Sequence, residues 1–340
     1  MIFGNKELKV RQFEITNFGG AETLKEFYRA MPQVSGDQVR VRVRFAGLNY
    51  ADVMQRRGLY PGIQEQGLPY TPGMEVVGEI DAIGPDVSNL SVGQRVFAKL
   101  EMGGYSEFVV APAQYVFVVP EGIVDEDVLG LVGTSGQTAF GVAKSLKAAR
   151  GRFAFITAAA GGVGTVLIQI CKHLGWVVIA GVSSDEKAAY VSAVGADYAI
   201  RYDRDGWEAE LLEISGEAGL AIVLDSVGGE PNREALDALG AQGELVFFGA
   251  ASGDHVGLPP EFVFPFIGRC NSVRGFGLIG YYLSGPNVLA ETIEGLFDLY
   301  LSGVIQNVFS SIVPAGQVVE VHRAMENRET RGKIQLDMQA

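Results

Sequence analysis

The sequence predicts an α/β protein in which a parallel, doubly wound sheet is joined to a second, mostly β part. From about residue 153 onward, short apolar runs alternate with amphipathic ones, which is the pattern of strands and helices in a parallel sheet. Before about residue 126, many short strand-like runs are separated by glycine and proline, which indicates a compact barrel. A chain of 340 residues has room for two such domains.

The stretch from Phe153 to Gly175 gives the strongest single signal. Residues 153–157 are rich in aromatic and β-branched types and predict a short buried strand. A turn follows and ends in Gly161-Gly162-Val163-Gly164, after which apolar residues recur at helical spacing. Glycines in such a turn let the backbone approach a pyrophosphate, and the helix N-terminus supplies free N–H donors. The stretch therefore predicts a dinucleotide site.

The match to the usual glycine pattern is incomplete, because the position of the first glycine holds Ala159. A second strand at 176–180 completes a strand–helix–strand unit of the expected length and strengthens the prediction. One alternative is a membrane span, since no charged residue occurs between Phe153 and Cys171; the glycines, the threonines and Gln169 disfavour it. The other alternative is a unit of this fold that binds nothing.

Composition narrows the class of partner. A net charge of −13 argues against a general binder of nucleic acid or of anionic membranes. The first residues contain no apolar signal core, so we expect a cytoplasmic protein. The two cysteines, Cys171 and Cys270, are too few for a disulfide framework or a cysteine zinc cage.

A series of motifs is spread over almost the whole chain. They are Ala46-Gly-Leu-Asn-Tyr-Ala-Asp52, Gly58-Leu-Tyr60-Pro61, Pro72-Gly-Met-Glu75, Gly93-Gln-Arg-Val96, the 158–164 turn, Asp225-Ser-Val-Gly228 and Gly332-Lys333. Together they resemble the medium-chain dehydrogenase/reductase superfamily, and within it the zinc-independent quinone oxidoreductases, the zeta-crystallin-like branch.

The resemblance implies an architecture. A GroES-like β-barrel catalytic domain is expected over residues 1–126 and a Rossmann domain, with a doubly wound parallel sheet, over 127–267. Residues 268–340 are expected to complete the catalytic domain. The branch commonly forms homodimers through the last strand of the Rossmann sheet, here near Val273–Phe276, and the apolar run 262–267 is similar to its edge-pairing region.

The residues at the zinc positions predict that no metal is bound. The zinc branch carries a cysteine and an aspartate three residues apart, and then a histidine–glutamate pair. The residues that align here are Asn49 and Asp52, then Met74 and Glu75. Asparagine and methionine are poor zinc ligands, so a site with about three protein ligands is not expected.

The residues after the second strand favour NADPH over NADH. An acidic residue at the end of that strand is the usual mark of NAD, and this chain has Ser183 there, with Lys187 in the next helical turn. Asp185 and Glu186 are expected to cap that helix and to point away from the cofactor. By resemblance, Tyr202 and Arg328 also reach the adenosine phosphate, unless they are only a solvated strand end and a surface arginine.

At the nicotinamide end, the resemblance supplies the candidate residues. They are Asn49, Tyr50, Asp52, Thr138 and Phe248. Tyr60 lies in a glycine–proline loop, where a phenol can orient a carbonyl or relay a proton, and we name Tyr60 and Asn49 as the catalytic candidates. Three alternatives stay open: Asp52 as a structural carboxylate, Tyr60 as loop packing, and Glu75 as buried structure.

The sequence thus predicts an NADPH-dependent reductase that passes a hydride to quinones or α,β-unsaturated carbonyls, with neither nucleic acid nor membrane as a partner. An enoyl-thioester reductase is one alternative. A second alternative is an NADPH-binding structural or interaction protein with little turnover. Turnover on small quinones and enones separates these three functions.

Overall fold

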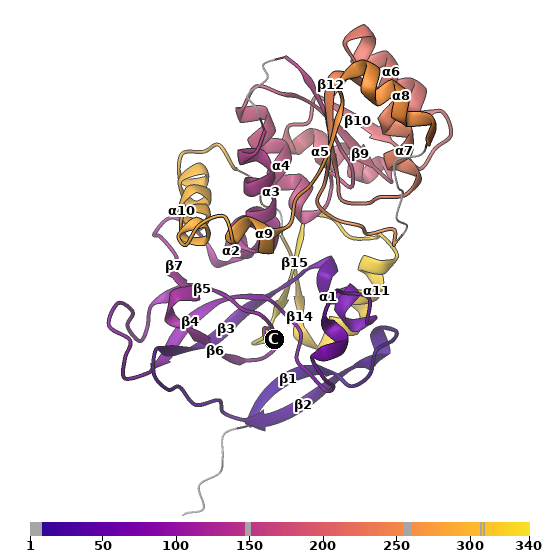
Figure 1. Ribbon diagram of the computed structural model, residues 1–340. Coiled ribbons are helices and arrows are strands. Elements are labelled where there is room, and N and C mark those ends of the chain that lie inside the picture. The colour runs from indigo at the N-terminus through magenta and orange to yellow at the C-terminus, as the bar shows by residue number, and fades with distance from the viewer. Residues whose placement is uncertain (1–8, 147–150, 254–259, 307, 309) are drawn as a thin grey trace, which may run out of the picture. The chain divides into compact units, whose positions relative to one another are not determined.

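The computed structural model describes residues 9–146, 151–253, 260–306, 308 and 310–340 (Figure 1). The chain divides into two compact units, one formed by Met1–Thr134 with Ser310–Ala340 and the other by Ser135–Phe309. None of the helices in the described ranges combines the length and the apolar character that a membrane span requires.

The first unit is mostly β. Its strands are β1 (Lys9–Ile15), β2 (Leu24–Ala30), β3 (Gln38–Leu48), β4 (Glu75–Ile83), β5 (Arg95–Lys99), β6 (Phe108–Pro112), β7 (Val116–Val118), β14 (Ser310–Pro314) and β15 (Lys333–Asp337). Its helices are α1 (Tyr50–Arg56), α2 (Asp125–Val132) and α11 (Val318–Glu326). The strands β14-β15-β3-β4-β5-β7 lie side by side in that order, and β6 pairs with β3.

Strand β3 forms because its sequence alternates. Val39, Val41 and Val43 are fully buried in the core, while the arginines between them face the other side. One of these arginines, Arg40, pairs with Asp81 on β4 at 2.8 Å. The alternation fixes the register of β3, and β3 in turn carries the loop that leads into α1.

The C-terminal strand of this unit returns to β3 from far along the chain. Strand β15 pairs antiparallel with β3, with Ile334 opposite Leu48 and Leu336 opposite Ala46. Because Lys333 precedes Ile334, it lies beside the end of β3, where Asn49 follows.

The second unit contains the parallel sheet, as predicted. Its strands are β8 (Phe153–Ile156), β9 (Val177–Val182), β10 (Tyr198–Arg201), β11 (Leu220–Asp225), β12 (Leu239–Phe247) and β13 (Ser272–Gly275). Its helices are α3 (Thr134–Lys144), α4 (Gly162–His173), α5 (Asp185–Val194), α6 (Trp207–Ser215), α7 (Glu230–Asp237), α8 (Pro260–Arg269), α9 (Leu278–Tyr282) and α10 (Val288–Leu301).

The strand order creates a switch point in this sheet. The order is β10-β9-β8-β11-β12-β13, and all neighbours that the structure describes run parallel. The chain therefore steps outward from β8 in one direction, returns, and steps outward from β11 in the other. Ligands of such sheets bind beyond the carboxyl ends of the strands where the direction reverses, here β8 and β11.

The unit boundaries differ from those expected at 126/127 and 267/268. Helix α2 packs on β3, β4, β14 and β15, so residues up to 134 belong to the first unit. Strand β13 extends the parallel sheet beside β12, which keeps residues 268–309 in the second unit. The sequence shows the mixed character of 268–309 but not its pairing partner, which lies about thirty residues away.

Gly133 has an extended backbone, which separates α2 from α3. The apolar run 262–267, which is similar to the edge-pairing region of the branch, lies in α8, where Phe262 and Phe266 are buried and Phe264 is 83% exposed.

Candidate active site

The predicted phosphate turn lies at the switch point. Strand β8 ends at Ile156, the chain turns through 157–161, and α4 begins at Gly162. The N-cap residue Gly161 makes no side-chain capping bond, and the first N–H groups of a helix have no partner within the helix. This arrangement offers donors and a positive dipole to a pyrophosphate.

Gly164 is required by packing. A Cβ at this position would lie 2.3 Å from the carbonyl oxygen of Ala159, which is backbone and cannot move aside cheaply. The unexpected Ala159 is itself fully buried beneath the helix. The residue before it, Ala158, has a positive φ of 46°, a conformation usually left to glycine. The chain thus keeps the turn despite the missing glycine.

Neighbouring strands hold this turn in place. Thr157 follows β8 and its hydroxyl donates to the Asp225 carboxylate at the end of β11, at 2.6 Å. The same carboxylate accepts the backbone N–H groups of Val227 and Gly228 at 3.0 and 2.9 Å. Thr157 and Asp225 are both buried, so the motif at 225–228 positions backbone at the switch point and has no free carboxylate for a ligand.

Three predicted residues for the adenosine phosphate meet at the end of β9. The ammonium of Lys187 lies 3.4 Å from the hydroxyl of Ser183. The ring of Tyr202 packs against Gly181, where a Cβ would come within 2.8 Å of it. A hydroxyl and an ammonium therefore lie together at the end of β9, with the Tyr202 ring beside the same strand, and such donors suit a phosphomonoester.

The acidic residues beside them are already engaged. Ser184, not Asp185, is the N-cap of α5 and accepts the N–H of Lys187 at 3.1 Å. The Asp185 carboxylate pairs with Arg201 at 2.8 Å and with Arg204 at 3.0 Å. Its hydrogen bond to Arg201 keeps the pKa of this exposed carboxyl below its usual value. The prediction that Asp185 caps the helix is wrong, while Asp185 does face basic partners of its own.

The remaining candidates are spread over both units. Thr138 is buried in α3, and Phe248 is half-buried directly after β12, where its N–H donates to the carbonyl of Asp225. Tyr50 begins α1, and Arg328 is exposed just after α11 with a positive φ of 59°. Tyr50 and Arg328 belong to the first unit and stay predicted cofactor contacts.

In the first unit, Asn49 and Asp52 form the start of α1. Asn49 is the N-cap, and the Asp52 carboxylate accepts its backbone N–H at 2.7 Å. Asp52 is completely buried, which raises the pKa of its carboxyl to about 7, although the Asn49 N–H favours the charged form. The bond from the Asn49 N–H and the burial of Asp52 therefore agree with a structural role for this carboxylate, one of the open alternatives.

A buried lysine that the sequence left without a role lies in the same place. The Lys333 ammonium donates to the Leu48 carbonyl at 2.9 Å and to Asn49 Oδ1 at 2.8 Å, and it is ion-paired with Glu75. Lys333 and Glu75 are 2% and 1% exposed, so the pair is shielded from water. In the sequence, Lys333 stands out only as part of the Gly332-Lys333 motif, which does not indicate its role.

The Glu75 carboxylate fills a space made by glycines. A Cβ on Gly47 would lie 2.3 Å from Glu75 Oε1, and one on Gly133 would lie 2.8 Å from it. Burial alone would raise the pKa of Glu75, but the ion pair with Lys333 and the N–H of Thr134 outweigh it and lower the pKa. The prediction of Glu75 as buried structure agrees with these contacts.

Asp52 also continues into a chain of buried polar groups. The Tyr105 hydroxyl lies 3.3 Å from Asp52 Oδ2 and 3.2 Å from His322 Nε2. Burial, reinforced by Arg56, lowers the pKa of His322 to about 3, so this histidine is neutral at physiological pH. The chain Asp52–Tyr105–His322 therefore holds a protonatable carboxyl beside two neutral rings.

Tyr60 lies close to this cluster. Its side chain is half-buried and packs on the core of the first unit. Burial, and then the charge of Asp52, raise its pKa, so the phenol keeps its proton at neutral pH and can donate a hydrogen bond. These contacts are compatible with a catalytic phenol and with simple loop packing alike.

The residues at the zinc positions do not fit a zinc ion. Asn49 Oδ1 and the Glu75 carboxylate already share the Lys333 ammonium, and the Met74 sulfur accepts a weak bond from Gln55 at 3.9 Å. A cation of the protein itself thus occupies the oxygen ligands. Across the part of the chain that the structure describes, no three His, Cys, Asp or Glu side chains cluster as metal ligands would.

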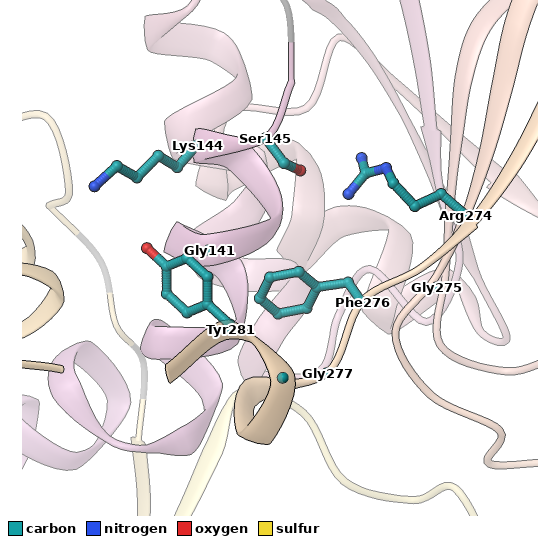
Figure 2. Close-up of a pocket in the computed structure, with 9 residues that line it drawn as sticks. Gly141, Lys144, Ser145, Arg274, Gly275, Phe276, Gly277 and Tyr281 are labelled. Carbon is teal, nitrogen blue, oxygen red and sulfur yellow. The ribbon is translucent and has the colours of Figure 1, made fainter. Parts of the chain in front are cut away.

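A cavity of about 440 Å³ lies elsewhere in the second unit, between α3, the end of β13 and α9 (Figure 2). Figure 2 shows the rings of Phe276 and Tyr281 facing Gly141, with Arg274 on one side, while Lys144 points away. Arg274 is paired with Glu244 at 2.9 Å. The cavity contains none of the candidate residues, and we do not assign the reaction to it.

Two family models match the chain. "Alcohol dehydrogenase GroES-like domain" matches residues 35–121, and "Zinc-binding dehydrogenase" matches residues 162–296. Among curated proteins, a quinone oxidoreductase of Pseudomonas aeruginosa is 31% identical, over 96% of this chain and 99% of its own. A 2-haloacrylate reductase of a Burkholderia species is 30% identical, over 89% and 91% of the two chains.

Solved structures agree with these matches. The quinone oxidoreductase of Escherichia coli, solved as a complex with NADPH, has a TM-score of 0.87 and 28% identity over 96% of this chain and 99% of that one. A quinone oxidoreductase of Pseudomonas syringae has the same TM-score, identity and coverage. Both contain the architecture described above, a GroES-like domain and a parallel Rossmann sheet. The chain therefore belongs to the quinone oxidoreductases of the medium-chain dehydrogenase/reductase superfamily, as its motifs predict.

Proposed function

We propose that the protein is an NADPH-dependent reductase that transfers a hydride to quinones or to α,β-unsaturated carbonyls without using zinc. The observation that carries the proposal is the Lys333 ammonium, which bonds Asn49 and Glu75 where the zinc branch holds its metal. With no Lewis acid to polarise a simple carbonyl, the acceptor has to be electron-poor already.

The cofactor assignment rests on two groups of residues in the second unit. The N-terminus of α4, at 161–164, is built to receive a pyrophosphate, and Ser183, Lys187 and Tyr202 suit a 2′-phosphate. Relatives solved with NADPH support the same choice. When bound, this cofactor supplies the hydride; the protein supplies position and electrostatics.

The acceptor class rests on the relatives together with the first unit. Quinone oxidoreductases and a 2-haloacrylate reductase, whose name specifies a conjugated carboxylate, are among the relatives at 30–31% identity. In this chain, Tyr60 and Asn49 are the side chains that we assign to the acceptor oxygen. Tyr60→Phe should lower the rate while leaving the affinity for NADPH nearly unchanged; an unaffected enzyme would remove Tyr60, and only Tyr60, from the proposal.

The decisive experiment measures NADPH oxidation by 1,4-benzoquinone and by a small enone, and separately NADP⁺ reduction by a simple alcohol, all in the presence of a chelator. We expect turnover with the quinone or the enone, none with the alcohol, and no loss on chelation. Deuterium at C4 of NADPH should appear at the β-carbon of the enone product. Rapid alcohol oxidation, or stoichiometric zinc whose removal abolishes activity, would refute the proposal.

The same assay decides between the alternatives. Binding of NADPH without turnover on any acceptor would identify a binding protein, and turnover only with an enoyl thioester would identify an enoyl-thioester reductase. Neither alternative is favoured by a specific contact in the described residues.

We also propose a homodimer. Strand β13 is an edge of the parallel sheet, and its Val273 side chain is 46% exposed. An unpaired edge invites pairing with another copy, and the exposed Phe264 and Ile267 of α8 add apolar surface in the same unit. Light scattering at micromolar concentration should give twice the monomer mass, and a monomer would contradict the proposal.

A further inference from the structure

We propose that Lys333 is a positioning residue: its ammonium turns the Asn49 carboxamide so that the N–H groups face the acceptor oxygen on which negative charge develops. The proposal rests on the proposed function and assigns a role within the same site. It begins from the bonding capacity of the two side chains.

The orientation of the Asn49 carboxamide follows from its partner. An ammonium has three N–H donors and accepts nothing, so the side-chain atom of Asn49 that meets Lys333 at 2.8 Å has to be the carbonyl oxygen. The amide nitrogen Nδ2 is then directed away from Lys333. This fixes an assignment that is otherwise ambiguous between oxygen and nitrogen.

The Lys333 ammonium is already engaged by groups of the protein. It donates hydrogen bonds to the Leu48 carbonyl and to Asn49 Oδ1, and it is ion-paired with the Glu75 carboxylate. Because the side chain is only 2% exposed, it cannot swing out to another partner. Any effect of Lys333 on the reaction is therefore exerted through the groups that it holds.

The Asn49 carboxamide, by contrast, has a buried N–H donor group without a hydrogen-bond partner. Nδ2 is buried, and no acceptor among the described residues lies within hydrogen-bond distance of it. An unpaired buried N–H is costly, and such groups in native proteins call for an explanation such as a ligand. The residue as a whole is 8% exposed.

The chemistry of hydride transfer indicates which group would accept the hydrogen bond from the Asn49 N–H. When an enone takes a hydride at its β-carbon, the C4–H bond of NADPH breaks and a C–H bond forms. The π electrons move onto the carbonyl oxygen, and the resulting enolate later takes a proton from water at its α-carbon. A fixed N–H aimed at that oxygen stabilises the charge as it appears. The Lys333 bond to the amide oxygen polarises the same amide and strengthens its N–H as a donor.

The key variant is Asn49→Asp. Aspartate has nearly the same shape and keeps an oxygen for Lys333, but it has no N–H to give. At saturating NADPH, and in preparations shown to be folded by circular dichroism, we expect single-turnover reduction of an enone to slow about 100-fold or more, the usual effect of losing one such donor. A rate within threefold of the wild type would overturn the proposal.

A second set of variants tests whether Lys333 acts through Asn49. Lys333→Met combined with Glu75→Gln removes both charges together and should slow hydride transfer about tenfold or more. In an Asn49→Ala background the same pair should add less than a threefold loss, because its route of action is gone. Losses that multiply would show that Lys333 is merely structural and would overturn the proposal.

A matched control keeps the comparison specific. Lys172→Met with Asp197→Asn removes an ion pair of 2.6 Å in the second unit and should change the rate less than twofold. If the wild type reduces no quinone or enone, the proposed function fails. The positioning role of Lys333 is then tested by measuring how tightly 4-nitrophenolate binds to the NADP⁺-loaded protein. Asn49→Asp should weaken that binding at least tenfold, and equal affinity would overturn the inference.

Discussion

The candidate sites of the two units are built from different groups. In the second unit the candidate site is backbone: the N-terminus of α4, brought close to the strands by Gly164. In the first unit it consists of side chains that are almost inaccessible to water, with the Lys333 ammonium held between Glu75 and Asn49. A site made from backbone tolerates many side chains around it, whereas a site made from buried charges depends on every partner.

The difference predicts different responses to mutation. In the second unit, changes should act on ligand affinity and depend on shape. In the first unit, changes should act on folding as well, because an unpaired buried charge is costly. The following variants test this difference between the two units, beginning with the variant that is expected to lose the most stability.

The largest effect is expected for Lys333→Met alone. This change leaves the Glu75 carboxylate buried without its cation, and removing one member of such a pair costs about 3–5 kcal/mol of unfolding free energy. The Lys333→Met/Glu75→Gln pair should recover most of that loss. Denaturant unfolding measures both proteins; equal stability of the single and paired variants would mean that the buried charges are not coupled.

Gly164→Ala should come next. Its Cβ would lie 2.3 Å from the Ala159 oxygen, so the turn has to shift, at a cost of about 1–3 kcal/mol. The shift should also weaken NADPH binding, which isothermal calorimetry reads directly. Gly268→Ala is the control, because no heavy atom lies within 4 Å of its added Cβ. Unchanged affinity in Gly164→Ala would contradict a backbone-built phosphate site.

Lys187→Ala should weaken NADPH by about 10–100-fold, the effect of losing one charge-assisted bond of roughly 1.5–3 kcal/mol. NADH should bind almost as before, since it has no 2′-phosphate. Lys144→Ala, at an exposed lysine of the same unit, serves as the control. Equal losses for both cofactors would show that Lys187 is structural and that the phosphate binds elsewhere.

In the wild type, the smallest effect is expected on the pH dependence of stability, because two titrations oppose each other. Asp52 has a raised pKa of about 7, so its contribution to unfolding free energy is full below about pH 4 and is lost as pH rises toward 7. His322 has a lowered pKa of about 3, so its contribution is full above about pH 6.5 and is lost as pH falls. Between these limits, raising the pH lowers the contribution of Asp52 to the free energy of unfolding and raises that of His322.

A variant that lacks one of the two groups should show the pH dependence of stability that is caused by the other. Asp52→Asn should lose stability as pH falls below 6.5, and His322→Gln should lose it as pH rises from 4 to 7, each by at most about 1.4 kcal/mol per pH unit. Both curves are compared with the wild type, which shares the remaining groups, Glu75, Arg56, Lys333 and Tyr105. Parallel curves for all three proteins would refute the opposed titrations.

The same contrast explains what the sequence predicts well. The strand–turn–helix of the second unit repeats local patterns, so the amino-acid order alone locates β8, α4 and the 161–164 turn. The pairing of Lys333 with Asn49 and Glu75 joins three distant segments and leaves no local pattern, so Lys333 stands out in the sequence only as part of a motif. The 268–309 segment was assigned to the other unit for the same reason, since β13 is defined by its neighbour β12.

The return of β15 to β3 also has a consequence for synthesis on the ribosome. The bond from Lys333 to the Leu48 carbonyl spans 285 residues, whereas the second unit is one continuous segment. Because translation proceeds from the N-terminus, the parallel-sheet unit can fold while β3 and β4 still lack β15. Until residue 333 emerges, Glu75 lacks the cation that neutralises it, so its buried ion pair with Lys333 can form only after the whole second unit has been synthesised.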